Sequence, residues 1–329
     1  MKLATINDGS RDGQLIIVNR EVNYAYHNKN MPKTLQQVLD NWDFIAEKLV
    51  KLYHDLNEGK LMGFPLNTHE LMAPLPRAYQ WSDGSAYVNH VELVRKARGA
   101  EMPENFWTDP LMYQGGSDSF LGPNQAIAVA DINWGVDFEA EIAVITNDVP
   151  MGCPAETAKD KILFIALVND VSLRNLVPNE MKKGFGFYQS KPSSAFSPVF
   201  VTPDELGDEW DGYKVNLPLR SYLNNQLFGE PNAGVDMTFD FPTLIAHAAK
   251  TRSLGAGTII GSGTVSNTDR SAGSSCIAEL RMLEKLEFGD FKTPFMQYGD
   301  TVKIEMLNKN NKSIFGAIEQ RVVSYENNR

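Results

Sequence analysis

From about residue 80 onward, the apolar residues of the chain come in short runs separated by frequent turn signals, which limits the possible folds. Val136–Thr146 alternates, so that its apolar residues share one face of a strand. Ile162–Val168 is a continuous apolar run, which is typical of a buried strand. Many strands with few helices predict a β-rich α+β fold and not a doubly wound α/β fold. Further strands are predicted at Val215–Leu217, Thr258–Ile260, Leu280–Leu286 and Thr301–Met306.

The first part of the chain is predicted to form a small β domain with one helix. Thr34 and Gln37 have the spacing of a capping box, and apolar residues recur at helical spacing from Leu35 to Leu52. The proline-containing run Met72–Pro76 marks the expected boundary to a larger domain. The expected domains are residues 1–72 and 73–329, with strands at Leu3–Ile6, Gln14–Val18 and Val22–Tyr26 in the first and a helix at Leu244–Thr251 in the second.

Composition and charge exclude several classes of protein. The formal net charge of -10 argues against sequence-independent binding of nucleic acid, because such binding depends on Lys and Arg that neutralise phosphates. Two cysteines, Cys153 and Cys276, do not make a disulfide framework. The N-terminal segment has no apolar h-region, and no apolar stretch approaches the ~20 residues of a membrane helix. We therefore expect a cytoplasmic protein with no nucleic-acid or membrane partner.

Three carboxylates at alternate positions are the strongest local signal for chemistry. Asp137, Glu139 and Glu141 would project from the same face of a strand. Stacked carboxylates repel one another unless they are solvated or bridged by a cation, and hard cations such as Mg²⁺ and Ca²⁺ take oxygen ligands. The alternative is a half-exposed strand whose polar face is in water. Taken alone, the motif leaves both interpretations open.

Two further segments carry residues suited to a site. Asp170 follows the buried run that ends at Val168, and Arg174 comes four residues later. The alternative there is an Asn-Asp turn that only ends the strand. His90 follows Asp83 by seven residues and could act as a general base near neutral pH. The alternative is that His90 has only a structural role.

The stretch Gly255–Thr264 is rich in glycine but does not match a nucleotide-binding motif. It is neither GxGxxG nor a Walker sequence, and no amphipathic helix is predicted to follow it. We interpret these glycines as positions where the chain turns tightly or where backbone approaches a ligand closely.

Together, the order and spacing of these motifs resemble the fumarylacetoacetate hydrolase family in its two-domain form. The resemblance covers the whole chain loosely and the region from Asp83 to Glu279 closely. The matching elements, in order, are Asp83 with His90, the strand pair Glu139 and Glu141, the segment Asn169–Arg174, Lys191 ahead of Ser197-Pro198, and Gly261–Thr264 followed by Glu279.

The resemblance implies a fold, a reaction and a set of site residues. The larger domain would be a mixed β-sandwich or β-roll, subunits would pair as homodimers, and the protein would hydrolyse carbon–carbon bonds in small acidic diketones. Mg²⁺ or Ca²⁺, with Mn²⁺ as a further candidate, would polarise the substrate carbonyl. The implied roles are metal binding for Asp83, Glu139, Glu141 and Asp170, water activation for His90 oriented by Glu279, stabilisation of the oxyanion and enolate for Arg174 and Lys191, and substrate contact for Ser85, Tyr113 and Thr264.

Two departures from the family pattern put the substrate in doubt. Ser85 stands where the family has a tyrosine that contacts substrate, and Val177 stands where it has a glutamine. Two alternatives therefore stay open. The same metal site could serve decarboxylation, hydration or isomerisation of 2-oxo acids, or the protein could bind small molecules without catalysis. The retention of His90 favours hydrolysis, because hydrolysis needs a base to activate water.

Overall fold

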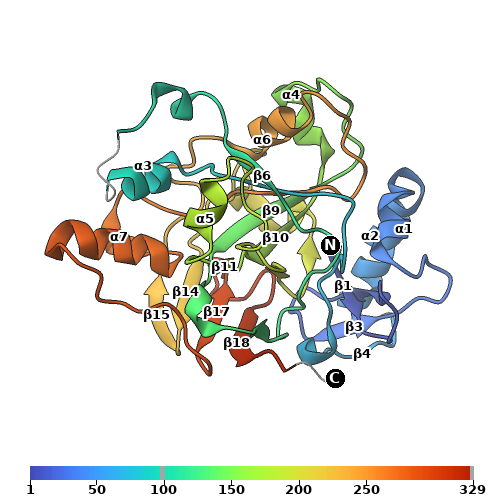
Figure 1. Cartoon of the computed structure of the whole chain (residues 1–329). Helices are drawn as coiled ribbons and strands as arrows, with labels where there is room; N and C mark the ends of the chain where they lie inside the picture. The colour runs from blue at the N-terminus through green and yellow to red at the C-terminus, as the bar shows by residue number, and fades with distance from the viewer. Residues whose placement is uncertain (97–100, 327–329) are drawn as a thin grey trace.

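The computed structural model of the chain describes residues 1–96 and 101–326, and sheets form its centre with helices around them (Figure 1). The strands are β1 (Lys2–Ile6), β2 (Gln14–Val18), β3 (Tyr24–Tyr26), β4 (Phe64–Pro65), β5 (Trp81–Gly84), β6 (Met112–Gly115), β7 (Ile127–Val129), β8 (Val136–Asp137), β9 (Ala140–Thr146), β10 (Ile162–Asn169), β11 (Ser172–Leu173), β12 (Ala195–Phe196), β13 (Phe200–Val201), β14 (Arg220–Leu223), β15 (Gln226–Gly229), β16 (Ile259–Gly261), β17 (Thr301–Glu305) and β18 (Ile318–Ser324). The largest sheet has the order β4-β3-β2-β1-β13-β10-β9-β16-β5-β6, and β12 pairs with β10. A second sheet has the order β15-β14-β17-β18-β7, and β8 pairs with β11. The predicted β-rich α+β fold is confirmed.

Strands β9 and β10 lie in the middle of the large sheet and are buried along their whole length. Their side chains alternate between two apolar clusters, one on each face of the sheet. The single strand predicted over Val136–Thr146 is interrupted, because Phe138 and Glu139 lie between β8 and β9. The Phe138 ring is fully buried and packs edge-on against Phe228, with ring centroids 5.2 Å apart. Asp137 and Glu141 therefore belong to different strands.

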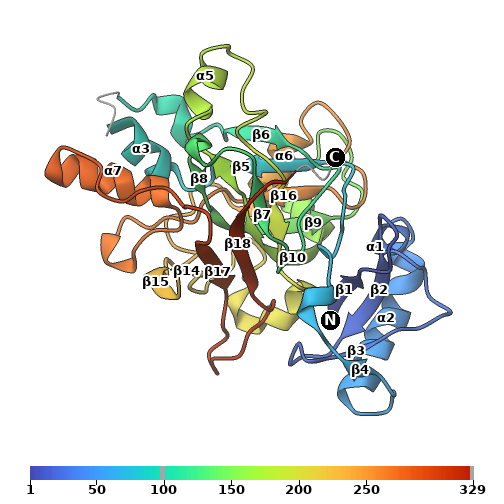
Figure 2. The same ribbon diagram turned by 60° about the horizontal axis from the view of Figure 1, so that its bottom comes forward.

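The N-terminal strands continue the large sheet, because β1 pairs antiparallel with β13. The helix predicted from Leu35 is confirmed at its start, where Thr34 and Gln37 form the capping box. It is divided into α1 (Leu35–Leu39) and α2 (Trp42–Asn57). Both views show these helices at one side of the molecule, next to the N-terminal strands (Figures 1 and 2). A domain boundary near residue 72 stays a prediction.

The strand predicted at Leu280–Leu286 is wrong, because this segment lies inside helix α7 (Ile277–Phe288). The segment consists of Leu, Arg, Met, Glu and Lys, which favour helix, and it has no β-branched residue. The Cys276 side chain caps the first turn, and Gly289 ends the helix with a φ of 82°. Helix α7 packs beside α3 (Val88–Lys96), as both views show (Figures 1 and 2).

The other predicted strands and the predicted helix of the larger domain are present in the structure, with one exception among the strands. Val215–Leu217 is not a strand in the described chain, since Val215 makes only an isolated bridge to Trp210. The helix predicted after Pro242 is α6 (Phe241–Ala248), which begins early because the Asp240 side chain caps it. No helix in residues 1–96 or 101–326 combines the length and apolar character needed to cross a membrane.

Candidate active site

Three buried carboxylates meet where neighbouring strands of the large sheet end. Asp83 lies on β5, Glu141 lies on β9, and Asp170 follows β10 directly. One oxygen of each carboxylate lies within 4.8 Å of the others. We call these three residues the carboxylate cluster. Strand β16 runs between β5 and β9, and its Gly261 pairs with Asp83 on one side and with Ala143 on the other.

Two glycines of the late glycine-rich stretch make room for Asp83. A Cβ atom on Gly261 would lie 2.2 Å from Asp83 Oδ1 and 2.5 Å from the Trp81 ring. Gly263 has a φ of +73°, and its N–H donates a hydrogen bond of 3.0 Å to Asp83 Oδ1. A Cβ atom there would lie 2.2 Å from the carbonyl oxygen of Gly84. Close approach of backbone to a functional side chain therefore explains this motif.

The charge balance of the cluster fits a bound cation. Burial raises the pKa of Asp83, and the charge of Asp170 adds to this effect. Burial and then the charge of Asp83 raise the pKa of Glu141. In the described part of the chain, neither carboxylate oxygen of Glu141 has a hydrogen-bond partner. Unpaired buried charge is costly, so a hard divalent cation with oxygen ligands suits these residues.

Two cations hold the neighbouring carboxylate, Glu139. Lys191 Nζ donates to Glu139 Oε2 at 2.5 Å and to Asp170 Oδ2 at 2.6 Å. Arg174 donates from Nη2 to Glu139 Oε1 at 2.7 Å. Burial opposes ionisation of Glu139, but the charges of Arg174 and Lys191 outweigh it and lower the pKa of this carboxyl. Of the four predicted metal ligands, three converge, and Glu139 lies beside them in ion pairs.

Asp137 does not lie on the same face as Glu139 and Glu141, where the sequence pattern placed it. Because the strand is interrupted after β8, Asp137 faces Arg174 and the start of α7 and does not belong to the carboxylate cluster. Even so, five buried carboxylates share only Arg174 and Lys191 as paired cations in the described residues; these carboxylates are Asp83, Asp137, Glu139, Glu141 and Asp170.

A histidine and a glutamate from different helices form a pair. His90 lies on α3, and its Nδ1 atom is 2.5 Å from Glu279 Oε2 on α7. The Glu279 carboxylate is fully buried and also accepts from Arg270 Nη1 at 2.9 Å and from Ser266 Oγ at 3.0 Å. When Nδ1 carries the proton that Glu279 accepts, Nε2 is left as a proton acceptor. A pair with this geometry can supply a general base together with the carboxylate that orients it.

The residues predicted to contact substrate lie around the same region. Tyr113 donates from its hydroxyl to Asp170 Oδ2 at 2.6 Å. A cavity of about 420 Å³ is lined by Tyr113, Lys191 and the segments around them. Ser85 directly follows β5 and is two residues from Asp83 in sequence, and Thr264 lies three residues after the end of β16 and follows Gly263. The described hydrogen bonds do not link their side chains to the carboxylates.

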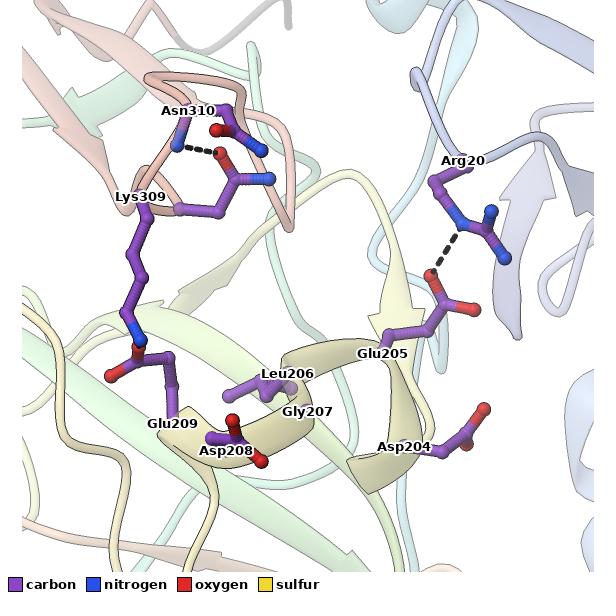
Figure 3. Close-up of a pocket in the computed structure, with 10 residues that line it drawn as sticks. Arg20, Asp204, Glu205, Leu206, Gly207, Asp208, Glu209, Lys309 and Asn310 are labelled. Carbon is purple, nitrogen blue, oxygen red and sulfur yellow. Dashed lines mark hydrogen bonds and ion pairs between the residues drawn. The ribbon is translucent and has the colours of Figure 1, made fainter.

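A second cavity, of about 370 Å³, has no residue of the carboxylate cluster in its lining. Figure 3 shows it between Arg20, the segment 204–209 and the loop that carries Lys309. Two of its acidic side chains are paired with lining cations, since Glu205 lies 3.8 Å from Arg20 Nε and Glu209 lies 2.7 Å from Lys309 Nζ. None of the predicted site residues lines this cavity, so we place the candidate active site at the cluster.

Comparison with models of protein families shows which family this chain belongs to. A profile described as "Fumarylacetoacetate (FAA) hydrolase C-terminal" matches residues 80–323, and one described as "Fumarylacetoacetase N-terminal domain 2" matches residues 1–77. The chain belongs to the fumarylacetoacetate hydrolase family.

Relatives in this family have several activities. An uncharacterized protein of Pyrococcus abyssi is 32% identical over 181 residues, which are 54% of this chain and 74% of the relative. A mitochondrial oxaloacetate tautomerase of Homo sapiens is 26% identical over 58% of this chain and 83% of its own length. The crystal structure of maleylpyruvate hydrolase from Sphingobium sp. SYK-6, in complex with manganese(II) and pyruvate, matches with a TM-score of 0.66 and 17% identity. That match covers 99% of this chain and 100% of the other. The chain is therefore an enzyme of the hydrolase, isomerase and tautomerase type that this family contains.

Three supporting residues of this fumarylacetoacetate hydrolase family member were not predicted, nor were the contacts of a fourth residue, Asp137. Ser194 donates from Oγ to Asp170 Oδ1 at 2.7 Å, and its place three residues after Lys191 was a usable signal. Ser266, two residues after Thr264, gave a similar signal for its contact with Glu279. Arg270 had no such signal, because only the folded chain brings it to Glu279. The contacts of Asp137 were also hidden, because they reach α7, which is 140 residues away in sequence.

Proposed function

We propose that the protein is a divalent-metal-dependent hydrolase that cleaves a carbon–carbon bond in small acidic diketones. The observation that carries the proposal is the hydrogen bond of 2.5 Å between His90 Nδ1 and Glu279 Oε2. This bond leaves Nε2 of the same ring free to accept a proton. A base oriented in this way, together with a cluster of buried carboxylates that could hold a metal, suits attack of water on a carbonyl.

The proposed metal ligands are Asp83, Glu141 and Asp170, with Glu139 as the fourth. The unpartnered oxygens of Glu141 and the excess of carboxylates over cations support this set. When bound, Mg²⁺, Mn²⁺ or Ca²⁺ would supply Lewis acidity toward the two oxygens of a dicarbonyl unit. The related maleylpyruvate hydrolase structure with manganese(II) and pyruvate supports both the metal and the 2-oxo acid.

His90 would carry the proton through the reaction. Nε2 takes a proton from water as the water oxygen bonds to the substrate carbonyl carbon. Glu279 stabilises the imidazolium that results, and Arg270 and Ser266 hold this carboxylate in place. When the carbon–carbon bond breaks, the electron pair stays on the departing enolate, and the proton on His90 is returned to its carbon. The products are a carboxylic acid and a 2-oxo acid.

Lys191 and Arg174 are proposed to stabilise the negative charge that develops on the substrate. The Lys191 ammonium has three N–H donors, and two of them bind Glu139 and Asp170. Lys191 also lines the cavity, so its third donor is available to a substrate oxygen there. Arg174 acts through Glu139, because its guanidinium keeps this carboxylate ionised.

The cavity next to Tyr113 is proposed to hold the rest of the substrate. Its outer wall is polar and includes the exposed side chains of Gln114, Asp118 and Ser119. Lys191 is the cationic residue in its lining, and two of its donors are already bound. A second carboxylate on the substrate would face Asp118 with little compensation. We therefore propose that the distal substituent is uncharged and polar.

A second function is favoured by the same pair. His90 and Glu279 can also move a proton between carbon and oxygen next to a carbonyl, without any bond to water. The human relative named as an oxaloacetate tautomerase supports this alternative. Isomerisation or decarboxylation of a 2-oxo acid would use the same residues in this way, and hydration would use them with water added to the substrate.

A direct assay separates these functions. The purified protein is incubated with Mg²⁺ or Mn²⁺ and a panel of acylpyruvates, other 2,4-diketo acids and oxaloacetate, with and without EDTA. EDTA-sensitive loss of the diketone absorbance, with one carboxylic acid and one 2-oxo acid formed, would support hydrolysis. Enol–keto exchange or CO₂ release from oxaloacetate alone would replace hydrolysis with the second function. Equal turnover with and without EDTA would refute the metal dependence.

Two variants test the ligand set. The double substitution Glu139→Gln and Glu141→Gln should abolish the EDTA-sensitive activity, and retained activity would contradict the assignment. Glu284→Gln is the matched control, because Glu284 is another buried glutamate but binds the backbone of residues 292 and 293. Light scattering of the purified protein tests the homodimer, which we also propose.

A further inference from the structure

Asp137 is fully buried and binds three donors from two different parts of the chain. Its Oδ1 accepts from Ile277 N at 2.8 Å, and its Oδ2 accepts from Ala278 N at 2.9 Å. The same Oδ2 accepts from Arg174 Nε at 2.8 Å. This carboxylate is outside the carboxylate cluster and belongs neither to the proposed metal ligands nor to the His90–Glu279 pair.

On one side, Asp137 fixes the first turn of α7. The first amides of a helix have no partner within the helix, and a carboxylate there also interacts favourably with the helix dipole. Asp137 binds the amides of Ile277 and Ala278, and Cys276 Sγ accepts from the next amide, that of Glu279, at 3.3 Å. Glu279 is thus held at the end of a fully bonded turn, with its side chain directed to His90.

On the other side, Asp137 fixes Arg174. This guanidinium uses Nε for Asp137 and Nη2 for Glu139, so the two carboxylates set its position together. Asp137 lies opposite Ser172 in the short β8–β11 pair, which brings it next to Arg174. One buried side chain therefore connects the His90–Glu279 pair with Glu139.

We propose that Asp137 is a positioning residue that sets Glu279, and through it His90, relative to Arg174 and Glu139. Its catalytic consequence rests on the proposed function. The carboxylate is required because three donors converge on its two oxygens. An asparagine would turn one oxygen into an N–H₂ group, and that group would face either the Ile277 amide or the Ala278 and Arg174 donors.

The test compares Asp137→Asn with Glu284→Gln in the full chain. Glu284 is the matched control, because it is a buried carboxylate of α7 that accepts from the amides of Lys292 and Thr293 at the far end of the helix. Both variants lose buried bonds to a carboxylate, so thermal unfolding is measured on both to compare the general loss of stability.

The decisive measurement is the NMR signal of the Nδ1 proton of His90 in protein with ¹⁵N-labelled histidine. The chain has five histidines, and His90→Gln assigns the signal. We expect Asp137→Asn to shift or broaden this signal and Glu284→Gln to leave it unchanged. With an active substrate, Asp137→Asn should also lower kcat by about 10–100-fold with little change in KM.

A wild-type His90 signal in folded Asp137→Asn would overturn the proposal, as would an equal shift in Glu284→Gln. Asp137→Glu is measured in parallel, because it keeps the charge but displaces the oxygens by one methylene, and it serves if Asp137→Asn does not fold. The signal does not depend on turnover. An inactive wild-type protein with these shifts would therefore refute the proposed function and support the positioning role.

Discussion

Replacement of Gly261 by alanine adds one methyl group to β16 and changes no proposed metal ligand. The Cβ atom would lie 2.2 Å from Asp83 Oδ1, and 2.5 Å from one atom and 2.9 Å from another of the Trp81 ring. Trp81 is buried with 1% exposure, so its ring has little freedom to move away. The Asp83 carboxylate or the backbone of β16 must therefore shift.

The size of the effect follows from these contacts. Ordinary contact begins at 3.4 Å, so relief of the 2.2 Å contact requires a shift of about 1 Å. Metal sites need ligand distances within about 0.2 Å, so a shift of this size should weaken binding by at least about 10–100-fold. Overpacking of the core should also lower the free energy of unfolding by about 1–3 kcal/mol.

Titration calorimetry with Mn²⁺ and Mg²⁺ measures the affinity, and thermal unfolding in EDTA measures stability without metal. The control is Gly255→Ala, because a Cβ atom at Gly255 would have no neighbour within 4 Å. We expect the control to bind metal like the wild type. Folded Gly261→Ala with wild-type metal affinity would refute the claim that this glycine makes room for Asp83.

Three further predictions concern catalysis, specificity and stability. His90→Ala should lower turnover by about 10²–10⁴-fold and leave Mn²⁺ affinity in calorimetry unchanged, and loss of the metal would make His90 a ligand or structural residue. Asp118→Asn should raise kcat/KM by about twofold to fivefold for diketones with a terminal carboxylate only, and Asp160→Asn, an equal charge change at an exposed site, should not. Burial lowers the pKa of Lys2 from its ordinary value of 10.5 to about 8, although the charge of Glu205 opposes this effect. Between pH 8 and pH 10.5 the folded protein therefore binds fewer protons than the unfolded chain, so stability rises with pH in this window. Relative to Lys2→Met, the free energy of unfolding of the wild type should increase by roughly 3 kcal/mol as pH rises from 8 to 10.5, and this gain is lost as pH falls back through 8. Chemical denaturation at several pH values measures it, and the same pH dependence in both proteins would contradict the prediction.

Local sequence patterns predicted the parts of the fold and site that depend on neighbouring residues. The alternation in β9 and the buried run of β10 predicted the strands that carry Glu141 and lead to Asp170, and the structure pairs these two strands with each other. The capping box at Thr34 predicted the start of a helix because both of its partners are local. Such signals involve only a few consecutive residues, so the local structure that they predict is present in the folded chain.

Other parts of the site depend on contacts between residues far apart in sequence, which local patterns do not show. His90 and Glu279 are 189 residues apart, and only the family resemblance joined them. Helix α7 is a different case, because its own residues favour helix and the strand prediction misread this local signal. Asp137 was expected to point with Glu139 and Glu141, but the interruption at Phe138 directs it elsewhere. No local pattern shows that Glu279 contacts His90 or that Asp137 contacts α7.

The position of β16 has a consequence for how the protein is made. Asp83 and Glu141 come early in the chain, but the strand that runs between theirs is Ile259–Gly261. During translation, the ribosome releases this strand long after both carboxylates, and Glu279 follows later still. Because pairing between distant segments forms late, a nascent chain that lacks β16 cannot assemble the proposed metal site. A cation would then bind only after β16 has paired with β5 and β9, and it would stabilise a sheet that is already complete.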